Sequence, residues 1–227
     1  MQHVKKLPVV ILISGRGSNL RAILDATKQG QLPIDIRAVI SNRPLAEGLE
    51  HARMAGIEAI AMDHSRYPDR EAFDLALQKE IDRFTPGLVI LAGYMRILSP
   101  GFVKHYLGRM LNIHPSLLPD YPGLDTHKRV LENGDSHHGA SVHFVTTELD
   151  GGPVVLQVRV PILPGDTAES LAKRVLEQEH RIYCKAIKWF AEGRLKFENG
   201  HAWLDQKKLE KPCLFKPASG EIENCVS

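Results

Sequence analysis

Asn112 and His114 are the two residues whose types and spacing most directly predict chemistry in this chain. They belong to the run 110–119 (MLNIHPSLLP). The first residues of this run have the pattern of a strand, and Pro115 ends that strand abruptly. Residues two apart on extended backbone project their side chains from the same face. An amide can donate to a developing oxyanion and an imidazole can donate or move a proton, so the pair suits a reaction at a carbonyl group. The alternative is a polar strand end that pairs with neighbouring backbone.

The length and composition of the chain limit the class of protein to which it can belong. The 227 residues suffice for one sizeable α/β core, and 43% apolar with 25% charged residues excludes disordered and fibrous classes. A net charge of +2 without a long basic run predicts neither a nucleic acid nor a membrane partner. The chain has neither a signal-peptide pattern nor an apolar run of transmembrane length. Its three scattered cysteines (Cys184, Cys213 and Cys225) are not typical of a disulfide framework or a zinc site, so we expect a cytoplasmic protein.

A glycine turn follows the first predicted strand. The continuous apolar run 7–14 predicts a strand buried on both faces, and the turn 15–19 (GRGSN) leads into a helical pattern. This geometry directs backbone N–H groups at an anion. Leu20 stands where a dinucleotide fingerprint needs glycine, the next strand ends in Asn42 instead of an acidic residue, and no Gly-Lys-Ser/Thr triplet follows. The turn therefore predicts a monophosphate site, or else a tight turn with no ligand.

Strand and helix patterns alternate through the first half of the chain. Strands are expected at 35–41, 57–62 and 88–92, with helices at 48–55 and 70–83. This alternation predicts an α/β fold with a doubly wound, mostly parallel sheet. Ligands of such sheets bind beyond the carboxyl ends of the strands, where the segments 15–19, 93–98 and 112–114 are all expected. These three segments are therefore predicted to line one cleft.

The second half of the chain has a different pattern of predicted helices and strands. We expect a helix at 127–133, a strand with one solvent-facing side at 139–145, and a second strand at 154–160. The turn signal 150–153 (DGGP) between the strands indicates an antiparallel addition in the C-terminal half, and Asp150 on its own could be only a turn former. Asp166 is the predicted N-cap of a long helix. A hairpin is expected at 195–198 and 202–204, and residues 205–227 are expected to be a loosely held tail.

Glu179 falls in the middle of the apolar face of that long helix. At about 100° per residue, the face contains Leu171, Ala172, Val175, Leu176, Ile182, Tyr183, Ala186, Ile187 and Phe190. A carboxylate there is costly unless it meets a partner. Either Glu179 is a paired or partly solvated residue at the flank of the helix, or it faces a bound cation.

Several motifs together carry a family resemblance over residues 7–204. They are LISGRGSNL (12–20), DREAFD (69–74), LAGYMRILSP (91–100), LNIHPSLLP (111–119), YPGL (121–124), SVHFV (141–145), ELDGGPV (148–154) and QEH (178–180). With these segments the chain closely resembles the folate-dependent glycinamide ribonucleotide formyltransferases of purine synthesis. The resemblance implies a Rossmann-like formyltransferase fold in one domain, 1–204. Within it, residues 1–100 would form the phosphate-binding half and 101–204 the catalytic and folate-binding half.

The resemblance also implies roles for individual residues. Asn112, His114 and Asp150 match the catalytic trio of the family. The ribonucleotide-binding positions match Gly17, Ser18, Asn19, Leu20 and Glu179. The folate-binding positions match Arg70, Met95, Arg96, Ile97, Leu98, Asn112, Thr146, Thr147, Glu148, Leu149 and Asp150. The implied co-substrate is 10-formyltetrahydrofolate, and no metal is needed because the formyl donor is already activated.

The resemblance implies small-molecule substrates for a monomer or homodimer. Three positions depart from the family pattern: Arg16 stands where Asn is common, Asp125 where His is frequent, and Leu176 where Gln is frequent. They put local substrate contacts in doubt, but not the reaction.

Three other functions remain open from the sequence. A formyltetrahydrofolate hydrolase could use a similar trio, but it resembles a two-part chain with an N-terminal regulatory domain. A methionyl-tRNA formyltransferase would need a basic C-terminal domain, and few residues follow Leu204. A non-catalytic nucleotide-binding module would leave the position of Glu179 unexplained.

Overall fold

The computed structural model describes residues 6–223 of the 227-residue chain. Residues of this range form two compact units, and the boundary falls between Asn112 and Ile113, inside strand β5 (Met110–His114). Cys225 and the last residues of the predicted tail lie outside the described range.

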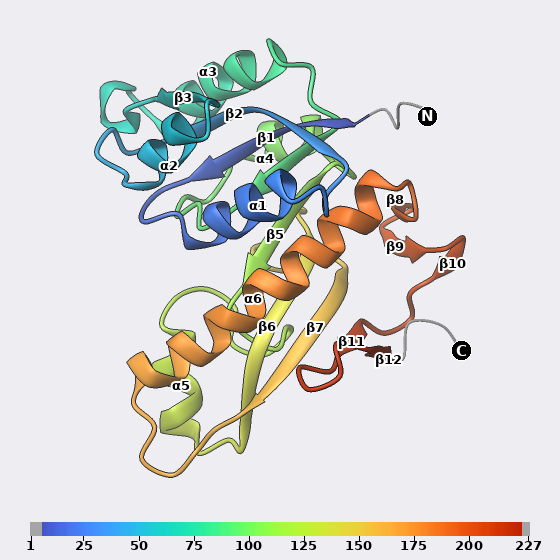
Figure 1. The fold of residues 1–227 in the computed structure, drawn as a ribbon. Coiled ribbons are helices and arrows are strands. Elements are labelled where there is room, and N and C mark those ends of the chain that lie inside the picture. The colour runs from blue at the N-terminus through green and yellow to red at the C-terminus, as the bar shows by residue number, and fades with distance from the viewer. Residues whose placement is uncertain (1–5, 224–227) are drawn as a thin grey trace. The chain divides into compact units, whose positions relative to one another are not determined.

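The first unit is built on parallel strands (Figure 1). They are β1 (Leu7–Ile13), β2 (Ile34–Ser41), β3 (Glu58–Ala61), β4 (Leu88–Leu91) and the start of β5, in the order β5-β4-β1-β2-β3. Ile11 pairs with Val39 on one side and with Ile90 on the other. β1 is therefore the strand from which the chain first winds one way and then the other, and the crevice beside such a strand is where α/β sheets bind ligands.

The helices of the first unit follow the predicted pattern. They are α1 (Ser18–Lys28), α2 (Gly48–Met54), a 3₁₀ turn at His64–Arg66, α3 (Arg70–Asp82) and α4 (Pro100–His105). Asp69 caps α3, because its carboxylate accepts the backbone N–H of Ala72 at 2.7 Å. The short helix α4 was not predicted, although Ser99 at its N-cap and Pro100 inside its first turn are typical start signals.

The second unit contains the predicted antiparallel addition. Strands β6 (His137–Phe144) and β7 (Val154–Pro161) pair antiparallel, and α5 (Thr126–Asn133) precedes them. Helix α6 (Ala168–Ala191) packs along both strands (Figure 1). The buried residues of α6 include Leu171, Val175, Ile182 and Ala186, as the apolar periodicity predicts. The expected α/β fold with a mostly parallel sheet and an antiparallel addition is thus confirmed.

Two local predictions in this unit are wrong. β6 has no solvent-facing side, because every residue from His138 to Phe144 is buried. The N-cap of α6 is Thr167, not Asp166, since Thr167 and Ser170 bond reciprocally to each other's backbone N–H groups. Asp166 instead pairs with Arg174 at 2.7 Å, and this contact holds the pKa of the Asp166 carboxyl well below its usual range.

The C-terminal segment is also more ordered than expected. After the confirmed hairpin of β8 (Leu195–Glu198) and β9 (His201–Leu204), the chain adds β10 (Lys207–Lys208), β11 (Cys213–Phe215) and β12 (Ile222–Glu223). β11 pairs parallel with β7, and Arg181 of α6 lies over the Phe215 ring and donates to the backbone oxygen of Pro217 at 2.8 Å. The expectation that the cysteines form no disulfide is corrected in part: Cys184 carries a thiol, whereas Cys213 is disulfide-bonded. No helix within residues 6–223 is long and apolar enough to span a membrane.

Candidate active site

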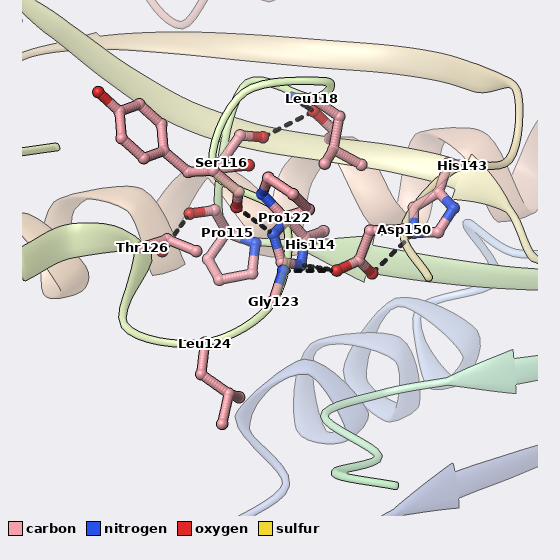
Figure 2. Close-up of polar contacts among 12 residues, drawn as sticks. His114, Pro115, Ser116, Leu118, Pro122, Gly123, Leu124, Thr126, His143 and Asp150 are labelled. Carbon is pink, nitrogen blue, oxygen red and sulfur yellow. Dashed lines mark hydrogen bonds and ion pairs between the residues drawn. The ribbon is translucent and has the colours of Figure 1, made fainter. Parts of the chain in front are cut away.

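His114 is the last residue of β5, and its side chain is 8% exposed. Asn112 lies two residues earlier on the same strand and is half-buried. The alternation of a strand directs both side chains to one face, as the sequence predicts. Pro115 then ends the strand, and the following loop returns toward His114 (Figure 2).

Asp150 occupies the turn between β6 and β7. Its backbone has φ of +51°, a left-handed conformation that aspartate tolerates better than most residues. The glycine two residues later is required, because a Cβ on Gly152 would lie 1.8 Å from the backbone oxygen of Phe144. The Asp-Gly-Gly sequence therefore lets the turn close tightly and brings the Asp150 carboxylate back over the end of β6.

The two functional groups meet in the second unit. Nδ1 of His114 lies 3.5 Å from Oδ2 of Asp150, and both side chains are more than nine-tenths buried (Figure 2). The same Oδ2 accepts the backbone N–H of Gly123 at 2.9 Å. On the other side of the imidazole, Nε2 lies 2.9 Å from the backbone oxygen of Tyr121. Both ring nitrogens of His114 therefore face oxygen acceptors.

This arrangement favours the doubly protonated ring. A carbonyl oxygen only accepts, and an ionised carboxylate only accepts. A neutral imidazole carries one proton and would leave one of its two nitrogens facing an acceptor without a hydrogen to share. The imidazolium has an N–H for each of the two oxygens.

The loop that supplies Tyr121 and Gly123 is fastened to β6 and β7. The Ser141 hydroxyl accepts the N–H of Leu118 at 3.0 Å and donates to the oxygen of Ser116 at 2.7 Å. Gln157 donates to the oxygen of Leu118 at 2.8 Å. From the α5 side, the Thr126 hydroxyl donates to the oxygen of Pro115 at 2.7 Å. These bonds fix the path of the loop over His114.

His143 is a neighbour of the dyad that sequence reasoning missed. Its Nε2 lies 3.8 Å from Oδ1 of Asp150 (Figure 2). Its Nδ1 donates to the backbone oxygen of Phe144 at 2.9 Å. Burial lowers the pKa of His143, so this ring is neutral beside the carboxylate. Its only sequence signal was its place in the SVHFV segment.

Two further histidines lie behind the loop. Nε2 of His138 is 3.1 Å from Nδ1 of His127. Burial lowers the pKa of His138 to about 4, and the neighbouring charges of His127 and His114 lower it further. Burial is also the main cause of the lowered pKa of His127. The pair is therefore neutral at pH 7, and it adds no positive charge beside His114.

The glycine turn of the first unit has the predicted form. Gly17 has φ of +76°, and a Cβ on it would lie 2.8 Å from the Cα of Gly48, so two backbone segments cross closely there. α1 begins at the next residue, Ser18, and no side chain caps it. The first N–H groups of a helix have no acceptor within the helix, so this end can meet an anion.

A second segment of the first unit is fastened to the same strand end. The backbone N–H of Met95 donates to the Ser14 hydroxyl at 2.8 Å, and that hydroxyl donates to Asn42 at 2.5 Å. The N–H of Ser14 in turn donates to the oxygen of Gly93 at 3.1 Å. The predicted phosphate turn and the segment 93–98 thus adjoin one another through Ser14, a residue to which sequence reasoning gave no role.

The remaining predicted site residues divide between the units. In the first unit, Arg70 is the exposed start of α3, Met95 and Ile97 are exposed, and Leu20 is buried. In the second, Leu149 is exposed, and the turn around it also holds Thr146, Thr147 and Glu148. Glu179 is 7% exposed on the inner face of α6, as its place in the apolar pattern predicts. Within residues 6–223 there is no group of three or more His, Cys, Asp or Glu side chains that could hold a metal ion.

The chain is similar to proteins of one known family. The formyl transferase family model matches residues 7–187. The phosphoribosylglycinamide formyltransferase of Escherichia coli is 57% identical over 201 residues, which are 88% of this chain and 95% of the relative. The solved structure of the Coxiella burnetii phosphoribosylglycinamide formyltransferase superposes with a TM-score of 0.87 at 52% identity, covering 90% of this chain and 96% of that one.

A solved formyltetrahydrofolate deformylase from Pseudomonas putida is a more distant neighbour. It has a TM-score of 0.79 at 27% identity, and the match covers 90% of this chain and 72% of that one. The family match spans most of the chain, and the E. coli relative is matched over nearly its whole length. The chain therefore belongs to the formyl transferase family.

Proposed function

We propose that this protein transfers the formyl group of 10-formyltetrahydrofolate to the amine of 5′-phosphoribosylglycinamide. The observation that carries the proposal is the environment of His114, which lies between the carboxylate of Asp150 and a backbone carbonyl. A charged imidazole at the end of a strand is the group needed to stabilise an alkoxide. Asn112, two residues earlier on β5, supplies the second donor.

The reaction begins when the substrate amine attacks the formyl carbon on N10 of the folate. The carbonyl oxygen becomes an alkoxide, and the N–H groups of Asn112 and the His114 imidazolium donate to it. The bond from the formyl carbon to N10 then breaks. The proton lost by the amine is taken up by N10, through water or His114, so the charges balance. Asp150 keeps His114 charged during these steps.

His114 must change one hydrogen bond to do this. Its Nε2–H is directed at the oxygen of Tyr121, and its other nitrogen faces Asp150. To donate to the alkoxide, the ring must exchange the Tyr121 oxygen for the reacting oxygen while keeping its contact with Asp150. Substrate binding therefore has to displace the loop residues around Tyr121.

Each group of the two substrates is assigned to particular residues of the chain. The turn Gly17, Ser18 and Asn19 with the following Leu20 takes the ribonucleotide phosphate at the start of α1. Glu179, buried on α6, takes the glycinamide amine, because an ionised carboxylate can accept an N–H of that amine and orient it. Folate contacts are assigned to Arg70, Met95–Leu98, Asn112 and Thr146–Asp150. Met95, Ile97 and Leu149 are exposed apolar side chains and offer surface for the aromatic parts of the folate.

A single assay tests the reaction. Purified protein is mixed with 10-formyltetrahydrofolate, and tetrahydrofolate formation is followed with and without the ribonucleotide. We expect turnover only with the ribonucleotide, together with formylated ribonucleotide in equal amount. Equal consumption of the folate without ribonucleotide would instead identify a hydrolase, which is the second candidate because of the likeness to the P. putida deformylase.

The proposed setting follows from the same substrates. Both are small molecules, and the proposed compartment is the cytoplasm. The net charge of +2 without a long basic run favours no nucleic acid partner. We propose a monomer or a homodimer, which sedimentation at several protein concentrations would distinguish.

A further inference from the structure

We propose that Asp74 is a positioning residue for folate binding, and that it acts by holding the segment 94–99 in shape. This inference rests on the proposed function, because residues 95–98 of that segment are the assigned folate contacts. Asp74 itself lies on α3, in the first unit, and it is 1% exposed. A carboxylate this deeply buried is costly unless it has a structural or functional partner.

The partner is the end of the segment. The backbone N–H of Ser99 donates to Oδ2 of Asp74 at 2.5 Å. Ser99 is also the N-cap of α4, where its own hydroxyl faces the N–H of Phe102. Asp74 therefore fixes the point at which the segment ends and α4 begins.

The other end of the segment is fixed independently. The N–H of Met95 donates to the Ser14 hydroxyl at 2.8 Å, so the segment is fastened at residue 95 and again at residue 99. Between these points, side chains alternate in exposure. Tyr94 and Ser99 are buried, whereas Met95 and Ile97 are 63% and 58% exposed. The two bonds thus hold a short stretch whose apolar side chains face outward, ready to meet a ligand.

Charge gives Asp74 a second link to the segment. Burial raises the pKa of Asp74, whereas the hydrogen bonds from Ser99 and then the cations of Arg96 and Arg70 lower it. The Arg96 guanidinium lies 4.7 Å from the centre of the Phe73 ring, next to Asp74 in sequence. Asp74 therefore adjoins both arginines that the proposed function assigns to the folate.

The bond to Ser99 is the main hydrogen-bonding contact of this carboxylate. Within residues 6–223, Oδ1 of Asp74, the hydroxyl of Tyr94 and Nε of Arg96 are buried without a hydrogen-bond partner. When a buried carboxylate has few hydrogen bonds, each of those bonds contributes strongly to holding it in place. Removing the acceptor should release residue 99 and let the outward-facing stretch shift. Small displacements of a binding segment can cost on the order of 100-fold in rate or affinity.

The test compares two substitutions at this position. Asp74→Ala removes the acceptor, whereas Asp74→Asn keeps an oxygen that can accept from Ser99. We expect Asp74→Ala to raise the KM for 10-formyltetrahydrofolate by about tenfold or more, with the KM for the ribonucleotide changed less than twofold. Asp74→Asn should restore most of the folate affinity. Equal folate KM values for Asp74→Ala and the wild-type protein would overturn the proposal.

Asp82 is the matched control on the same helix. Its carboxylate accepts the Tyr106 hydroxyl at 2.9 Å, so Asp82→Ala also removes a carboxylate with a structural partner. It is the last residue of α3, and its carboxylate contacts Tyr106 and His105 instead of Ser99. We expect it to lower the melting temperature without changing the folate KM. A folate KM that rises equally in both alanine variants would mean that α3 acts only through stability, and would overturn the proposal.

Hydrogen exchange separates this proposal from the proposed function. Without any ligand, Asp74→Ala should speed amide exchange at Ser99 by at least tenfold and leave α1 unchanged. Unchanged exchange would overturn the positioning role, whatever the enzyme does. Faster exchange with an unchanged folate KM would instead show that residues 95–98 do not contact the folate, and would overturn the role of Asp74 in folate binding.

A second variant covers the case in which Asp74→Ala does not fold. Ser99 has φ of −68°, which lies in the range of proline, so Ser99→Pro deletes the same N–H donor from the other side. Ser99→Ala keeps the N–H and removes only the hydroxyl, which caps α4 and also interacts with Asp74, so it serves as the control for the N–H itself. We expect Ser99→Pro, but not Ser99→Ala, to raise the folate KM by about tenfold or more. A higher folate KM in Ser99→Ala than in Ser99→Pro would overturn the proposal.

Discussion

Nε2 of His114 lies 2.9 Å from the backbone oxygen of Tyr121. A carbonyl oxygen of the chain itself thus occupies the position at the imidazole that a reacting carbonyl oxygen needs. Ser141 and Gln157 fasten the loop that carries Tyr121 to β6 and β7. The loop therefore holds the ring in a donating orientation before any substrate arrives.

Removing either proposed oxyanion donor should affect turnover far more than binding. We expect His114→Ala and Asn112→Ala each to lose about 2.7 kcal/mol or more of transition-state stabilisation, which is about 100-fold in kcat. Steady-state kinetics with both substrates measures this. His137→Ala, an exposed histidine on β6, is the control and should keep its activity. Near wild-type turnover in either donor variant would remove that residue from the mechanism.

Asp150→Asn tests the charge that supports the imidazolium. Asparagine tolerates the φ of +51° and its oxygen can still accept from Gly123, so the turn should survive. We expect kcat to fall by about 100-fold or more, because the imidazolium loses its carboxylate partner. Nitrogen NMR of the ring reports the protonated fraction. The account is wrong if that fraction is the same in Asp150→Asn and the wild-type protein.

Gly17→Val tests the phosphate turn. Its side chain would meet the backbone of Gly48 at 2.8 Å, so the turn must open. We expect the KM for the ribonucleotide to rise tenfold or more, with the folate KM nearly unchanged. Gly30→Val is the matched control, because Gly30 has φ of +73° but no atom near its Cβ position. Equal weakening of both substrates would indicate general misfolding instead of a lost phosphate site.

Glu179→Gln removes a buried negative charge and keeps the shape of the side chain. If the carboxylate orients the amine of the substrate, affinity and turnover for the ribonucleotide should fall together by tenfold or more, the scale of one charge-assisted hydrogen bond. Folate affinity should stay the same. Glu177→Gln, on the exposed side of α6, is the control. Normal ribonucleotide kinetics with a lower melting temperature would make Glu179 a structural residue only.

His138 should make stability depend on pH. Its pKa is about 4 in the folded protein against the ordinary histidine value of 6.5 in the unfolded chain, so the unfolded chain binds more protons between these values. The contribution is therefore fully present above pH 6.5 and is lost as pH falls toward 4, by at most about 3 kcal/mol. Urea unfolding at several pH values measures it. His138→Gln should flatten this dependence, whereas the exposed neighbour variant His137→Gln should not.

Much of the architecture can be read from the chain itself. The apolar run of β1 and the glycine turn before α1 are local patterns, so their prediction needs no partner. The place of Glu179 on the buried face of α6 follows from helical periodicity alone. The pairing of Asn112 and His114 on one strand face is equally local, because alternation along β5 decides it.

The remaining features of the fold and the site depend on contacts between residues far apart in the sequence. Asp150 reads as a turn former until the closing of the β6–β7 turn places its carboxylate 3.5 Å from His114. β6 shows an alternating pattern, yet every residue from His138 to Phe144 is buried, and α6 packs against this strand. The C-terminal segment has no periodicity of its own, and its strand β11 forms because β7 offers an edge with which to pair.

The chain by itself thus determined which residues have chemistry and which element carries each of them, because those depend on residue type and on spacing along one helix or strand. Only the tertiary structure decided what each group faces. Asp74 is an ordinary helix residue in sequence, and it becomes a positioning residue because the fold brings Ser99 within 2.5 Å of its carboxylate. Hydrogen bonds between residues 25 positions apart leave no trace in local periodicity, since their geometry is created only when the strands and helices pack.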